Sequence, residues 1–179
     1  CEAINIYFWI ELDNEAGGDD KFIIIDDVAI YSIDTHEDVS TNMLYIGNSH
    51  GDDTIEHIYH ILNNINYDKE FTLYTLFIGG STVEQHYNNF VNELPAYELR
   101  YWDASRSMWA TVVGVSIQTA LSLENKWDYV CFQQSSRYIA TAGNLDHLDE
   151  LTAGVRDIVG DDTEFGFNAP WSYRGSDLG

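Results

Sequence analysis

The chain has 179 residues, of which 45% are hydrophobic and 14% aromatic, and this is enough for one packed domain with or without part of another. Eight basic and thirty acidic residues give a net charge of −22. Because such a surface repels phosphate groups and anionic lipid headgroups, we expect neither a nucleic-acid partner nor a membrane partner. No apolar run approaches the roughly 20 residues that span a bilayer.

Residues 1–34 differ in character from the rest of the chain. The segments 4–12 and 22–33 predict two β-strands joined by a polar, glycine-bearing turn. The second, FIIIDDVAIYSI, resembles the closing strand of jelly-roll carbohydrate-binding modules. Two strands cannot form a sandwich alone, so they are interpreted as the remnant of an upstream β-domain or as an accessory hairpin. The polar residues 35–41 (THEDVST) predict a linker.

From residue 42 onward, predicted strands and helices alternate. Short apolar strands are predicted at 43–47, 71–80, 127–134 and 164–171. The intervening helices are indicated by apolar residues three or four apart, as in the segments 55–65 and 145–158, and residues 97–113 predict an inserted hairpin. The pattern predicts a flavodoxin-like three-layer α/β/α sandwich with a parallel sheet over residues 42–179.

Small and amide-bearing residues follow the predicted strands, in the segments GNSH, GGS, QQSS and PWSY. In open parallel sheets, ligands bind at the carboxyl ends of the strands. Ser49 at a strand-to-helix turn presents its hydroxyl at a helix N-terminus, which favours developing negative charge. The backbone amides of Ser49 and Gly80, together with the side-chain amide of Gln134, could form an oxyanion hole.

Four blocks, YIGNSH, LFIGGSTVEQHYNN, WDYVCFQQSS and PWSY, resemble those of the SGNH/GDSL hydrolase superfamily. The resemblance is to a bacterial subfamily of unknown function whose first block usually reads G-N-S-F. It implies a serine ester hydrolase with Ser49 as the nucleophile and Gly80 as an oxyanion donor. Gln134 stands where the wider superfamily has a donating asparagine, with Gln133 as the alternative.

The sequence departs from this pattern at two places. His50 follows the serine where the subfamily commonly has phenylalanine. The superfamily supplies its acid and base from an Asp-x-x-His block near the C-terminus, and none follows Tyr173. We therefore expect the chain to be a fragment whose catalytic acid–base pair lies beyond Gly179, and to be catalytically impaired by itself.

The predicted substrate contacts are His86, Trp171 and Tyr173, with packing as the alternative role for each. We expect deacylation, often deacetylation, of a carbohydrate or related small ester through an acyl-enzyme on Ser49. The alternative is a catalytically incomplete SGNH-like module that binds glycans. The carbohydrate-module resemblance favours an extracellular or periplasmic location. No spacing predicts a metal site or a cofactor, and Cys131 is expected to be a buried free thiol.

Overall fold

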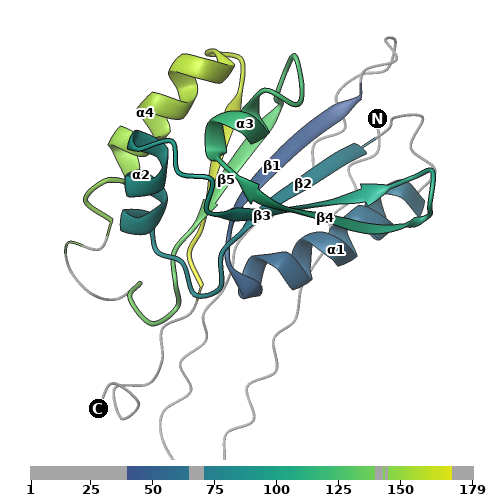
Figure 1. Cartoon of the computed structure of the whole chain (residues 1–179), viewed down its shortest axis with the longest axis horizontal. Coiled ribbons are helices and arrows are strands. Elements are labelled where there is room, and N and C mark those ends of the chain that lie inside the picture. The colour runs from purple at the N-terminus through teal and green to yellow at the C-terminus, as the bar shows by residue number, and fades with distance from the viewer. Residues whose placement is uncertain (1–39, 65–70, 140–142, 144, 171–179) are drawn as a thin grey trace, which may run out of the picture. The chain divides into compact units, whose positions relative to one another are not determined.

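The computed structural model describes residues 40–64, 71–139, 143 and 145–170 (Figure 1). The chain divides into two compact units, Cys1–Glu37 and Asp38–Gly179, and the described residues all belong to the second. The strands predicted within residues 1–34 and most of the predicted linker lie outside the described residues. Trp171 and Tyr173 lie outside them as well.

The described residues form a mixed α/β fold around one six-stranded sheet. Its strands follow the order β4-β3-β2-β1-β5-β6. Four of them, β2, β1, β5 and β6, run parallel, whereas β3 and β4 form a hairpin that pairs antiparallel with the free edge of β2. In chain order the strands are β1 (Thr41–Gly47), β2 (Phe71–Phe77), β3 (Tyr97–Asp103), β4 (Met108–Val115), β5 (Tyr129–Gln133) and β6 (Glu164–Asn168).

The mixed sheet corrects the prediction of a wholly parallel one. The hairpin expected over residues 97–113 does form, but it extends the main sheet because β3 pairs with β2 from Tyr74↔Tyr101 to Phe77↔Glu98. Antiparallel pairing is available to any strand that reaches an open sheet edge, so the hairpin gains ladder hydrogen bonds there. The expected alternation of strands and helices is otherwise confirmed.

Helices cover both faces of the sheet, with α1 on one face and α2, α3 and α4 on the other (Figure 1). They are α1 (Ser49–Asn64), α2 (Val83–Val91), α3 (Ile117–Leu121) and α4 (Leu148–Val159). Thr82 and Ser116 cap α2 and α3, because their hydroxyls accept hydrogen bonds from the backbone amides of Gln85 and Thr119. Among the described residues, no helix is long and apolar enough to cross a membrane.

Successive residues of β1 face opposite sides of the sheet and so enter two different cores. Leu44 and Ile46 belong to the larger core, which also includes α4 residues Leu151 and Val155. Tyr45 belongs to a smaller core beneath α1, together with Ile55 and Leu73 and with the half-buried Met43, Ile58, Tyr59, Trp109 and Cys131. The sheet therefore separates a large apolar core from a smaller one beneath α1.

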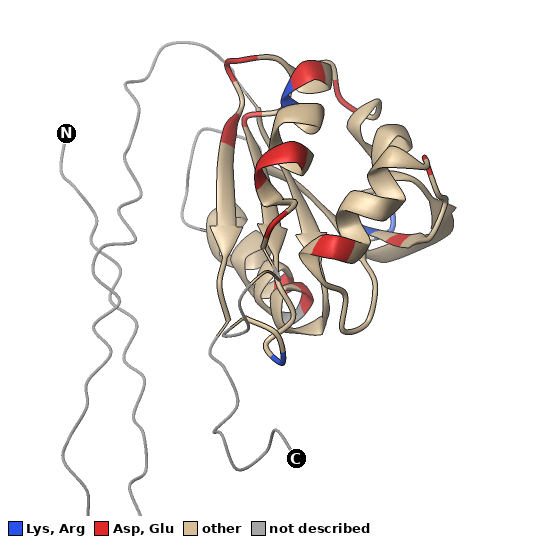
Figure 2. Cartoon of the chain, turned by 90° about the vertical axis from the view of Figure 1, so that its left-hand side faces the viewer, with Lys and Arg blue, Asp and Glu red and all other residues tan. Residues whose placement is uncertain are grey.

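Acidic positions are more frequent than basic ones along the elements of the α2 and α4 side (Figure 2). Exposed members of this group are Glu84, Asp149, Glu150, Asp157, Asp161 and Asp162. Arg156 on α4 is a basic neighbour, and its guanidinium lies 4.6 Å from the ring of Phe165. A face of this charge repels anionic partners, as the composition indicates.

The first turn of α1 packs directly onto the ring of Tyr45. A Cβ atom on Gly51 would lie 2.1 Å from that ring, and one on Gly47 would lie 2.6 Å from it. The Tyr45 hydroxyl is itself held by a hydrogen bond of 2.9 Å from the side chain of Asn168 on β6. Two glycines and one tyrosine thus fix where α1 begins relative to β1, β5 and β6.

We expect the substitution Gly51→Ala to lower the free energy of unfolding by at least about 1 kcal/mol. The added methyl group overpacks the Tyr45 ring, and this cost exceeds what alanine gains in a helix. Urea unfolding followed by circular dichroism measures the change. Thr54→Ala, an exposed position on the same helix, is the control and should shift stability by less than about 0.5 kcal/mol. An equally stable Gly51→Ala protein would contradict the close packing.

Candidate functional site

The carboxyl ends of β1, β2 and β5 meet at one edge of the sheet because the three strands are parallel neighbours. Ser49 is the first residue of α1 at this edge, and its side chain is exposed. The structure therefore brings the GNS, GGS and QQSS segments together, as expected from the sequence. The strand order changes direction between β1 and β5, which is the place where open α/β sheets bind ligands.

Asn48, which precedes the serine, connects all three strand ends. Its backbone amide donates to Oε1 of Gln133 at 3.0 Å, and its Nδ2 donates to the backbone oxygen of Ser81 at 3.2 Å. Its Oδ1 accepts from the amide of His50 at 3.2 Å, so the side chain also caps α1. Asn48 is 1% exposed, and a buried amide with these partners holds Ser49 at a fixed place.

Gly80 lies in an exposed turn after β2 with φ of +66°, a conformation that favours glycine. Ser81 fixes this turn, because its hydroxyl donates to the backbone oxygen of Gly47 at 3.1 Å. Within the described part of the chain, the backbone amides of Ser49 and Gly80 donate to no protein acceptor. Both predicted backbone donors are therefore available at the edge that carries the serine hydroxyl.

Gln133, the last residue of β5, and Gln134, which follows it, have different partners, and both are fully buried. Oε1 of Gln134 accepts from the amides of Val83 and Ser135, at 3.3 and 2.8 Å. Gln133 binds Asn48 through Oε1, and its Nε2 has no hydrogen-bond partner among the described residues. Both glutamines are buried at the edge of the sheet that carries Ser49. The choice between them as the side-chain oxyanion donor stays a prediction.

His50 and Ser136 lie side by side at the same edge. Nε2 of His50 is 3.3 Å from the Ser136 hydroxyl, which connects the start of α1 to the segment after β5. His50 is exposed and Ser136 is 5% exposed. A serine beside an imidazole is a possible nucleophile–base arrangement, so Ser136 is an alternative to Ser49 that the sequence analysis did not consider.

His86, predicted to contact the substrate, is 0% exposed. Its Nδ1 lies 2.9 Å from the hydroxyl of Tyr97, and the two rings stack with centroids 5.8 Å apart. Burial lowers the pKa of His86 to about 3, so the ring is neutral at physiological pH. His86 therefore packs between α2 and β3 rather than on the exposed surface that carries Ser49, and a substrate contact would require it to become accessible.

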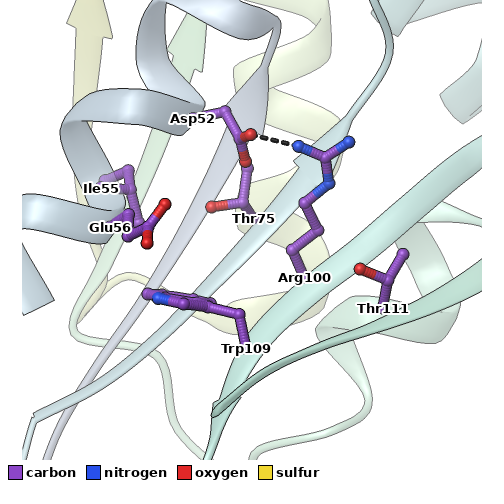
Figure 3. Close-up of a pocket in the computed structure, with 7 residues that line it drawn as sticks. All are labelled: Asp52, Ile55, Glu56, Thr75, Arg100, Trp109 and Thr111. Carbon is purple, nitrogen blue, oxygen red and sulfur yellow. Dashed lines mark hydrogen bonds and ion pairs between the residues drawn. The ribbon is translucent and has the colours of Figure 1, made fainter.

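A pocket that the sequence analysis missed lies between α1 and the β2–β3–β4 part of the sheet. Figure 3 shows the side chains that line it, among them the ion pair between Asp52 of α1 and Arg100 of β3. Arg100 also pairs with Glu98 at 2.7 Å, and its guanidinium lies 3.8 Å from the centre of the Phe77 ring. No local sequence pattern indicates this pocket, because its lining comes from segments that are distant along the chain.

The described residues contain no group of three or more His, Cys, Asp or Glu side chains that could hold a metal ion. Cys131 is a free, half-buried thiol, and burial raises its pKa to about 11. A thiol with this pKa is protonated at neutral pH and is a poor nucleophile. The chemistry of the strand edge therefore rests on hydroxyl, amide and imidazole groups.

These features define a mixed α/β domain with a serine at the carboxyl edge of its parallel strands. The chain belongs to the DUF4886 family, a domain of unknown function whose family model matches residues 42–176. No curated protein matches the chain. A similar solved structure is the crystal structure of a DUF4886 family protein from Bacteroides uniformis, with 29% sequence identity and a TM-score of 0.67. The match covers 75% of this chain and 51% of that one, so this chain spans about half of that protein's length.

The comparisons correct the assignment to the SGNH/GDSL superfamily. Both matches are to the DUF4886 family, and the sheet is mixed rather than wholly parallel. The blocks that suggested the assignment, as far as the structure describes them, run from strands into the turns and helices that follow. A likeness between such segments is not enough to assign a family or a function.

Because the folded protein keeps His86 neutral, its stability should fall in acid. The imidazole of His86 becomes protonated below about pH 6.5 in the unfolded chain, which is the ordinary pKa of histidine. In the folded chain it becomes protonated only near pH 3. Between pH 7 and pH 5 this costs the wild type about 2 kcal/mol of unfolding free energy. Urea unfolding of the wild type and of His86→Gln at both pH values measures it, and the variant should lose about 2 kcal/mol less. Equal losses in both proteins would contradict the buried neutral imidazole.

Proposed function

We propose that the protein is a serine ester hydrolase that removes acyl groups, such as acetyl, from a carbohydrate or a related small ester. The observation that carries the proposal is the position of Ser49. Its hydroxyl is exposed at the N-terminus of a 16-residue helix, at the carboxyl edge of parallel strands. The backbone amides of Ser49 and Gly80, which have no acceptor among the described residues, belong to the same edge.

The strand order supports this placement. The four parallel strands follow the order β2-β1-β5-β6, and we propose that this part of the sheet is of the flavodoxin-like, doubly wound type. In that arrangement the crevice beside the first strand is the natural ligand site. Ser49 and the Gln133–Gln134 pair flank it, since they lie at the carboxyl ends of β1 and β5.

In the proposed mechanism, the Ser49 oxygen attacks the ester carbonyl carbon and its proton passes to a base. The negative charge that develops on the carbonyl oxygen is stabilised by the amides of Ser49 and Gly80 and by the positive end of the α1 dipole. The tetrahedral intermediate then expels the alcohol, which takes up the proton. Water hydrolyses the acyl-serine by the same steps and releases the acid.

The described histidines have other environments, so we propose that the base lies outside the described residues. Nε2 of His50 faces Ser136, and His86 is buried against Tyr97. His147 lies 3.2 Å from Glu84 and stacks on Tyr87. The other two, His57 and His60, lie two or more turns along α1 from Ser49.

We expect Ser49→Ala in the full-length protein to lower p-nitrophenyl acetate hydrolysis by at least about 1,000-fold, because the variant lacks the attacking oxygen. Ser136→Ala is the matched control, since it removes the neighbouring hydroxyl and should leave the rate at the same order of magnitude. Circular dichroism of each variant checks the fold.

Two results would contradict this proposal. An active Ser49→Ala protein would exclude the acyl-enzyme on Ser49, and loss of activity in Ser136→Ala alone would move the nucleophile to the His50–Ser136 pair. A full-length protein without esterase activity would favour the alternative, a glycan-binding module.

A further inference from the structure

The pocket between α1 and the β2–β3–β4 part of the sheet, here named the α1 cavity, has a volume of about 210 Å³. This is smaller than the roughly 300–1,000 Å³ of pockets that hold drug-sized ligands, so it suits one small ring rather than a chain of rings. Its lining consists of Asp52, Ile55, Glu56, Thr75, Arg100, Trp109 and Thr111.

The α1 cavity opens beside the candidate site. Asp52 lies three residues after Ser49 on α1, and side chains at this spacing share one face of a helix. Arg100 packs over Phe77, the last residue of β2, and the Gly79–Gly80 turn follows two residues later. A ligand in the cavity could therefore place a substituent near the serine hydroxyl.

Trp109 gives the cavity an aromatic wall. Figure 3 shows its indole ring along one side of the pocket, opposite Glu56 and Thr75. Tyr59 and Trp102 hold the ring through edge contacts, with centroids 5.6 and 6.0 Å away. The negative face of an indole attracts C–H groups, which carry a small positive charge, and a sugar ring presents such groups on its faces.

Polar groups surround this wall. Asp52 and Glu56 offer acceptors, Arg100 offers donors, and Thr75 and Thr111 offer both. The carboxylates repel an anionic ligand and Arg100 repels a cationic one. The polar lining disfavours an aliphatic chain. Hydroxyl groups both donate and accept, so a neutral polyhydroxylated ring matches these donors and acceptors.

The buried indole N–H of Trp109 has no hydrogen-bond partner among the described residues. A ligand oxygen at the margin of the cavity could accept a hydrogen bond from it.

We infer that the α1 cavity binds one neutral sugar ring, with Trp109 against a ring face and Glu56, Asp52 and Arg100 hydrogen-bonded to its hydroxyls. The ring would be the alcohol half of the ester whose acyl carbon Ser49 attacks. The link to Ser49 rests on the proposed function, whereas binding of the sugar does not.

The test is a titration of methyl β-D-glucopyranoside into the Ser49→Ala protein, followed by the indole N–H resonances in an NMR spectrum. The chain has five tryptophans, and Trp109→Phe identifies the resonance of Trp109. We expect that resonance to shift saturably with the glucoside and not with sorbitol, which has the hydroxyls but no ring. Glu56→Ala, a change at an exposed position, should weaken binding about fivefold. Val113→Ala, an exposed site on β4 outside the cavity, is the matched control and should bind like the parent.

Absence of a saturable shift, an equal response to sorbitol, or unchanged affinity in Glu56→Ala would overturn the inference. The titration contains no ester, so its outcome is independent of hydrolysis. An active esterase without glucoside binding would overturn the sugar site alone. Glucoside binding in a protein without esterase activity would keep the sugar site and overturn the proposed hydrolysis.

Discussion

The hydrogen bonds of Asn48 are the constraint on which the rest of the site depends. One buried side chain joins the end of β1 to the segments after β2 and β5 and also caps α1. An unsatisfied buried amide costs about 1–3 kcal/mol, so these partners are coupled and the three strand ends move as one unit. Ser49, the next residue, is therefore exposed on a support that is itself buried and fully bonded.

Tyr45 adds a steric constraint from below. Its ring occupies the space under Gly47 and Gly51, so α1 can begin where it does only because both positions lack a side chain. The β3–β4 hairpin supplies the remaining wall. By joining the edge of β2, it brings Arg100 and Trp109 opposite α1 and creates a cavity that a sheet ending at β2 would lack. The exposed serine at the strand end and the polar, aromatic-walled cavity are therefore about one turn of α1 apart.

The sequence predicted much of this architecture from local patterns. Alternating apolar segments located the strands and helices, and the small residues GNS and GGS marked the edge that carries Ser49 and Gly80. These predictions succeed because strand period, helix period and tight turns are encoded by neighbouring residues. The hairpin was also predicted. Its pairing with β2 depends on long-range contacts, which the local pattern of residues 97–113 does not encode.

The parts that could not be predicted depend on side chains that meet only after folding. Asp52 and Arg100 are 48 residues apart along the chain, and His50 and Ser136 are 86 apart. His86 was predicted to contact the substrate, with packing as the alternative, and the structure buries it against Tyr97, which belongs to a later strand. The blocks that suggested a hydrolase superfamily do lie at one edge of the sheet, as far as the structure describes them, but the family they suggested was wrong.

The central claim is that Ser49 is a nucleophile at a preorganised strand edge. The most direct measurement is labelling of the full-length protein with a fluorophosphonate, followed by mass spectrometry of its peptides. The account predicts a single phosphonyl adduct on the peptide that contains Ser49, formed in native protein and absent after unfolding in urea. An adduct on Ser136, or no adduct at all in native protein, would contradict it.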